Sequence, residues 1–208
     1  MGCLKFIISL VVKAVFTLFL VIFAVYLFIF GGFNTIKDYV NSFINPSEQT
    51  LTAKASKIAD FSAVGEEYEL TRTIDMLGVQ AVLAQNKLNN QKMAFVDTGW
   101  AINLSKNDIR SKSIDKQLVD IAAKFNTPAV KLENLKIVGK GYFKAFGQSV
   151  PYVRVKLHIT GTPNKSFEGI LGVVEEKDKK NSVIISVNDI GKYSQQKAEK
   201  FFESVKLN

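Results

Sequence analysis

Cysteine and histidine are almost absent from this sequence, which has only Cys3 and His158. One cysteine cannot form a disulfide within the chain, and no thiol follows it that could act as a nucleophile or metal ligand. One histidine excludes a metal site built from several imidazoles and leaves a catalytic triad a single candidate base. No phosphate-cradling glycine loop or dinucleotide fingerprint is present, so we expect no cofactor and no metal.

Arginine is scarce as well, although the net charge is +8. Only Arg72, Arg110 and Arg154 could offer the bidentate fork that suits phosphates and base edges, so the basic excess is almost entirely lysine. This composition indicates a solvated lysine-rich surface. We therefore expect no nucleic-acid partner.

Charge is missing altogether between Lys13 and Lys37. About 20 consecutive apolar residues in a helix cover a hydrocarbon core of about 30 Å, and a helix satisfies its own backbone polar groups there. The sequence therefore predicts one transmembrane helix over about residues 14–33, with the lipid bilayer as a partner. Representative anchor residues of this span are Ala14, Phe19, Phe23, Tyr26 and Phe30.

The orientation follows from the flanking charges. Lys5 and Lys13 precede the span and only Lys37 follows it closely, which predicts a cytoplasmic N-terminus and an extracytoplasmic C-terminal part in the cell membrane. A cleaved signal peptide is the alternative, but its apolar region runs about 7 to 15 residues before a small-residue site. Here the run is longer and the only Ala-x-Ala, at Ala53 and Ala55, lies far beyond it. We expect the helix to stay attached.

The span continues into a second apolar pattern, Phe33, Ile36, Val40, Phe43 and Ile44, at helical spacing. This amphipathic extension could rest on the membrane surface or pack on the following domain. We therefore divide the chain into an anchor over 1–45, a polar linker over 46–56 and a soluble domain over 57–208.

The soluble domain alternates apolar and polar residues in several short segments, which predicts strands. Two amphipathic helices are also expected, from Ile114 to Phe125 after a Ser113 cap, and after a Ser194 cap through Phe201 and Phe202. Short turns between strands favour antiparallel pairs, and helices need an apolar sheet face to cover. The predicted fold class is α+β, an antiparallel sheet packed with two or more helices. The predicted strands are 68–76, 79–84, 92–97, 135–146, 150–160, 167–174 and 183–188.

An internal duplication is a further hypothesis. Residues 78–98 and 169–189 can be aligned without a gap, and both segments precede a capped amphipathic helix. Any two hairpins share apolar alternation, so a coincidence of form is the competing explanation.

The segment from Ala94 to Gly99, with Asp97-Thr98-Gly99 after two apolar strand residues, resembles the catalytic turn of aspartic proteases. In that family two close carboxylates share a proton and activate a water. The resemblance implies Asp97 as a catalytic carboxylate, a dimer that supplies the second one, and Ile170-Leu171-Gly172 as the supporting segment. The sequence departs from the family at Trp100, and the pseudo-repeat sets Asn188 opposite Asp97.

Two other polar residues are candidates for binding. His158 alternates with apolar positions and shares its strand face with Arg154 and Lys156, as expected of an exposed strand histidine. Arg72 falls on the apolar side of the 68–76 strand, where it either extends past the sheet edge or meets a buried acid.

These observations favour a single-pass membrane protein whose extracytoplasmic domain is a non-enzymatic binding module of the cell envelope, acting on another envelope protein or polymer. A carrier of a hydrophobic ligand, held between helix and sheet, is the first alternative. A dimeric aspartic-type protease that uses Asp97 is the second.

Overall fold

The computed structural model describes residues 48–76, 79–97, 104–123, 130–161, 164–176 and 181–208. The predicted transmembrane helix, its residues Ala14, Phe19, Phe23, Tyr26 and Phe30, and the amphipathic extension lie outside these residues. Within the described part, no helix has the length and apolar character needed to span a membrane.

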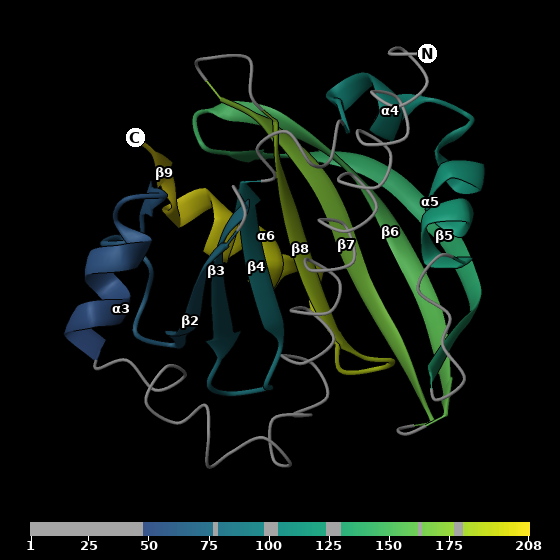
Figure 1. Cartoon of the computed structure of the whole chain (residues 1–208), viewed down its shortest axis with the longest axis horizontal. Helices are drawn as coiled ribbons and strands as arrows, with labels where there is room; N and C mark the ends of the chain where they lie inside the picture. The colour runs from purple at the N-terminus through teal and green to yellow at the C-terminus, as the bar shows by residue number, and fades with distance from the viewer. Residues whose placement is uncertain (1–47, 77–78, 98–103, 124–129, 162–163, 177–180) are drawn as a thin grey trace, which may run out of the picture.

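Most of the described chain is β-sheet, and the predicted α+β class is confirmed to that extent (Figure 1). Seven strands form one sheet in the order β2-β3-β4-β8-β7-β6-β5, with every neighbouring pair antiparallel, and β1 pairs with β9 in a separate small sheet. In chain order the elements are α3 (Glu48–Ala55), β1 (Ala59–Asp60), β2 (Tyr68–Met76), β3 (Val79–Asn86), β4 (Lys92–Asp97), α4 (Lys106–Arg110), α5 (Ile114–Ala123), β5 (Val130–Ala145), β6 (Gln148–Gly161), β7 (Lys165–Glu175), β8 (Asn181–Asp189), α6 (Gln195–Ser204) and β9 (Lys206–Leu207).

All seven predicted strands and both predicted helices are present. Ser194 caps α6, since its hydroxyl accepts a hydrogen bond from the Lys197 N–H, and the Ser113 carbonyl accepts from the Gln117 N–H at the start of α5. Strands β5 and β6 are longer than expected and meet at a two-residue turn, Phe146 and Gly147.

One face of the sheet, which we call the α6 face, carries the largest apolar core. Phe201 and Phe202 of α6 pack edge to face with their ring centroids 5.2 Å apart, and Phe202 also contacts Phe143 of β5. Phe95 of β4 and Ile184 of β8 lie in the same cluster. Because α6 is amphipathic, burying its apolar side against the sheet holds the C-terminal end of the chain in place.

The opposite face, the α5 face, carries two adjoining apolar clusters and a third, smaller one of Ile159, Phe167 and Val187. Ile109 of α4 and Ile114 and Leu118 of α5 pack on Val153 of β6 and Val173 of β7. The second cluster lies on β2, β3, β4 and β8, and Ile185 in it is the register partner of Leu171 in the first. Both faces of the central strands are therefore buried.

Part of the predicted polar linker is helical. Residues 48–55 form α3, which buries Leu51 and Ala55 one turn apart and lies beside the edge strand β2 (Figure 1). Its other side chains are mostly polar, so the sequence shows only a narrow apolar stripe.

The short helix α4 was not expected. It starts with a capping box in which the Ser105 hydroxyl accepts from the Asp108 N–H and the Asp108 carboxylate accepts from the Ser105 N–H. The Asp108 carboxylate also accepts from the Ser105 hydroxyl, and this hydrogen bond together with the one from the Ser105 N–H lowers the pKa of Asp108. A five-residue helix is too short to show helical periodicity, and only the Ser-x-x-Asp spacing could have indicated it.

The strand registers do not support the gap-free version of the duplication. Val96 of β4 lies opposite Ala81, whereas the matching Val187 of β8 lies opposite Gly169, three positions away from the expected Gly172. The two hairpins therefore cannot be superimposed at one offset. Each hairpin pairs by its own pattern of apolar residues, which sets register independently of sequence identity.

Candidate functional site

Asp97 ends β4 on the α6 face and is partly buried. Its direct neighbours in the described strands are Gln80 of β3 and Ser182 of β8, neither of which is acidic. Asp75 lies one strand further, opposite Gln80, so its backbone is about 10 Å from that of Asp97. Proton sharing needs two carboxylates in contact, and this register does not bring them there.

The other parts of the protease resemblance are also separated from Asp97. Strands β4 and β8 are antiparallel, and Asp97 pairs with Ser182 whereas Lys92, at the other end of β4, pairs with Val187. Asn188 therefore lies at the end of β8 that is far from Asp97. The Ile170–Gly172 segment of β7 is separated from β4 by β8. The turn residues Thr98, Gly99 and Trp100 lie outside the described residues.

Strand β2 has a β-bulge between Leu70 and Arg72. Because of the extra residue, the side chain of Arg72 lies on the opposite face of the sheet from that of Leu70. Arg72 is the partner of Leu83 on the α5 face and shares that face with Ile74, whereas Tyr68 packs in the core of the α6 face. Partial burial removes water from the guanidinium and lowers the pKa of Arg72.

His158 lies on β6 and contacts a hydroxyl rather than an acid. Its Nδ1 is 2.7 Å from Ser166 Oγ of β7, and Glu133 is its register partner on β5. Strand alternation places His158, Lys156 and Arg154 on the α6 face, as expected from the sequence.

The sequence did not indicate the buried acid that lies beside Arg154 and Lys156 on this face. Glu168 of β7 is buried, accepts a hydrogen bond from Arg154 Nε at 2.7 Å, and lies 3.9 Å from Lys156 Nζ. The Arg154 guanidinium lies over the Tyr193 ring. Tyr193 is itself partly buried, which raises its pKa. Arg154 is therefore already satisfied within the chain.

A surface hollow surrounds the turn between β5 and β6. We call it the turn groove, and its volume is about 550 Å³. A second hollow of about 480 Å³ lies on the other side of the same turn and is lined by Lys144, Ser149 and Glu203 among others. The turn groove is lined by Lys106, Phe146, Gly147, Gln148, Glu175, Glu176, Lys206 and Leu207.

The turn itself has an unusual backbone. Phe146 has a φ of 55° and Gly147 one of 68°, so both central residues are left-handed, as in type I′ hairpin turns. Glycine adopts this conformation freely, but a bulky residue rarely does. The Phe146 ring packs on Phe95 and Phe202, which holds it in place.

Hydrogen bonds fix the rim of the groove. Gln148 Nε2 donates to the Glu175 carbonyl at 2.8 Å, and its Oε1 accepts from the Glu175 N–H at 3.2 Å, so the side chain pairs like a strand backbone. Lys106 lies 3.6 Å from the Glu175 carboxylate, and Glu176 accepts from the Ser182 hydroxyl. The groove has a fixed rim of both charges around a partly apolar floor formed by Phe146 and Leu207.

The groove is assembled from α4, the β5–β6 turn, the end of β7 and β9, which are far apart in the sequence. No local motif could have identified it. Among the described residues, no three His, Cys, Asp or Glu side chains are placed so that they could hold a metal ion. Comparison with models of known protein families gives no match, and comparison with curated proteins finds no similar sequence.

Proposed function

We propose that this chain is a single-pass membrane protein whose extracytoplasmic α+β domain binds another envelope protein through the turn groove, without catalysis. The observation that carries the proposal is Phe146, a bulky residue held in a left-handed conformation at the floor of the groove. Strained backbone persists only where its surroundings impose it, and it concentrates at sites that bind or react.

The chemistry of the groove supports a polypeptide ligand. Phe146 and Leu207 offer apolar surface for one side chain, while Lys106, Lys206, Glu175 and Glu176 present both charges around it. A volume of about 550 Å³ lies within the usual range of small binding sites, about 300 to 1,000 Å³. A short extended segment with one apolar and flanking charged residues would complement this surface.

Crosslinking in intact cells tests the proposal. The tagged full chain is crosslinked, extracted in detergent and purified, and the co-purifying proteins are quantified. Reversing two groove charges, Lys106→Glu with Lys206→Glu, should reduce recovery of the partner about tenfold, which is about 1.4 kcal/mol of binding energy.

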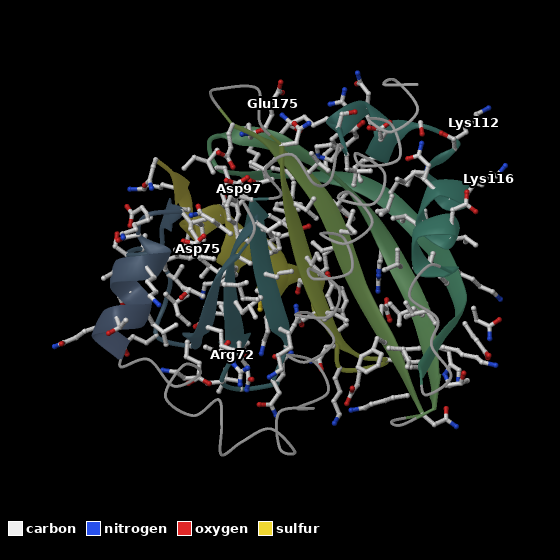
Figure 2. All side chains as sticks on the ribbon, viewed as in Figure 1. Arg72, Asp75, Asp97, Lys112, Lys116 and Glu175 are labelled. Carbon is white, nitrogen blue, oxygen red and sulfur yellow. The ribbon has the colours of Figure 1, made fainter. Side chains whose placement is uncertain are left out.

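The control makes the same change in net charge elsewhere. Lys112→Glu with Lys116→Glu alters the α5 side of the domain, away from Glu175 (Figure 2), and should leave recovery unchanged. Recovery of monomer alone, or an equal loss in both double variants, would refute binding through the groove.

The orientation is tested separately. Leu88, in the turn between β3 and β4, is 78% exposed and therefore accessible to a label. Leu88→Cys in a Cys3→Ser background should react with a membrane-impermeant thiol reagent on whole cells. Labelling only after lysis would place the domain on the cytoplasmic side.

The two alternative functions receive no comparable support. The space between α6 and the sheet contains the packed rings of Phe95, Phe143, Phe201 and Phe202, which leaves little reason to place a hydrophobic ligand there. The protease still depends on a second copy to supply an aspartate beside Asp97.

A further inference from the structure

The apolar cluster on β2, β3, β4 and β8 has no helix over it among the described elements. We call it the β3–β4 patch, and no residue of α3, α4, α5 or α6 belongs to it. Figure 1 shows α4 and α5 over the other half of the same face, on β5, β6 and β7. The patch consists of Ile74, Val79, Ala81, Leu83, Ala94, Val96 and Ile185.

The patch is nevertheless buried. Leu83 and Val96 are each 1% exposed and Ala94 is 5% exposed. No described helix contributes to the cluster, so among the described elements this part of the α5 face has no helix packed on it. Burying apolar side chains is the main favourable term in folding, so a segment that covers the patch should itself be apolar on one side.

The chain before Glu48 meets this requirement. We propose that residues 33–44 dock on the β3–β4 patch as an amphipathic helix, with Phe33, Ile36, Val40, Phe43 and Ile44 facing the sheet. The described chain begins at α3, which lies beside β2 at the edge of the patch (Figure 1), so the preceding residues start next to the surface that they would cover.

The dimensions agree with this docking. A helix over residues 33–44 is about 18 Å long at 1.5 Å per residue. The four strands from β2 to β8 span three spacings, or about 14 Å. Residues 45–47 can bridge about 10 Å between the end of this helix and α3, and Pro46 breaks the helical pattern there.

The other nearby segment, residues 98–103, fits less well. The described residues on either side of it are Asp97, at the end of β4, and Leu104, which packs with Val173 of β7 and Val153 of β6, two and three strands away from β4. Leu83 and Ala94 pair with each other two residues along the strands from the pair of Ala81 and Val96, and the two pairs are about 7 Å apart. Those residues need a cover that reaches the middle of the sheet.

Docking would fix the domain against its tether. If residues 14–33 span the bilayer, as in the proposed function, the helix that follows would hold the domain at a constant height and present the turn groove in one orientation. The docking itself does not depend on any partner of that groove.

Site-specific photocrosslinking in the membrane-embedded full chain tests the docking. The probe p-benzoylphenylalanine replaces Phe43, and the crosslinked peptides are identified by mass spectrometry. We expect an intramolecular adduct to residues 79–97. As a control the probe replaces Ser42, on the far side of the apolar stripe, and should give at least tenfold less of that adduct.

A second variant keeps the test independent of folding. Val40→Asp with the probe at Phe43 should reduce the adduct to residues 79–97 about tenfold, because a carboxylate on the apolar stripe opposes burial, whereas Ser42→Asp should leave it unchanged. Adducts from Phe43 to lipid only would assign the stripe to the membrane surface, and adducts to a second copy would assign the patch to a dimer. Either result, or equal yields from Phe43 and Ser42, overturns the proposal. None of them would change the outcome of the groove-charge experiment.

Discussion

At the scale of single residues, the turn between β5 and β6 depends on Gly147. A Cβ at this position would meet nothing within 4 Å, so only its positive φ of 68° opposes a side chain. Gly147→Ala should therefore destabilise the protein by about 1 kcal/mol, the usual cost of an L-residue in this region. Urea unfolding of the detergent-solubilised chain measures the change.

Gly65 provides the matched control for this prediction. It is exposed, has an ordinary φ, and its added Cβ would make only van der Waals contacts at 3.8 Å and beyond. Gly65→Ala should cost nothing measurable. If the two variants lost equal stability, the strain assigned to the turn would be absent.

The buried acid Glu168 gives a second prediction. Its side chain is 9% exposed, while those of Arg154 and Lys156 are 42% and 46% exposed. Arg154→Leu should cost about 3 kcal/mol, because it leaves a buried carboxylate without its main partner. Lys156→Leu should cost less than about 1 kcal/mol, because that pair is distant and exposed. Changing Arg154 and Glu168 to Leu together should restore most of the loss in urea unfolding, and a double variant as unstable as Arg154→Leu would contradict this account.

Tyr68 should make stability depend on alkaline pH. Its hydroxyl donates to the Lys197 carbonyl at 2.8 Å, and burial raises its pKa to about 12. An unfolded tyrosine has a pKa of about 10, so between about pH 10 and 12 only the unfolded chain loses the proton. The stabilisation is complete below pH 10 and falls as the pH rises through this range. Tyr68→Phe should flatten the decline of the urea midpoint, whereas Tyr142→Phe, at a position 57% exposed, should not.

At the scale of elements, Gln91 attaches α6 to the sheet through Ser194, the residue that caps the helix. The buried Gln91 side chain accepts from the Ser194 N–H at 2.8 Å and donates to the Ser194 carbonyl and the Ser186 hydroxyl, both at 2.9 Å. Gln91→Leu should cost about 2 to 3 kcal/mol, because it leaves buried polar groups unpaired. Hydrogen exchange should show faster opening of α6. Gln85→Leu, on an exposed hydrogen bond to Asn90, should leave α6 protected, and equal exchange in both variants would argue against this attachment.

The elements also show how far the sequence could predict the structure. Alternation located every strand of the main sheet because each has at least one buried face, and serine caps located α5 and α6. Helix α3 was taken for a linker because only Leu51 and Ala55 are buried. The bulge at Thr71 moved Arg72 to the other face, and no residue type signals such an insertion.

At the scale of the whole molecule, the sheet joins two parts of the chain at β4 and β8. Phe95 pairs with Ile184, and about 90 residues separate the two strands. Local patterns do not encode which distant strand becomes a neighbour, so the strand order could not be predicted. The turn groove has the same origin, since Lys106, Phe146, Glu175 and Leu207 come from α4, the β5–β6 turn, β7 and β9, which lie together only in the folded chain.

The proposed attachment of this domain to a membrane gives the last prediction. If the apolar stretch crosses the bilayer as one helix, the chain should stay in the membrane fraction after an alkaline carbonate wash and leave it only with detergent, because removing about 20 apolar residues from lipid is strongly unfavourable. A variant lacking residues 14–33 should appear in the soluble fraction with its sheet intact by circular dichroism. Mass spectrometry of the native chain should find its N-terminus before residue 14. A soluble polypeptide that begins after residue 33 would instead mean that the stretch is a cleaved signal, and the domain would then meet its partners without a tether.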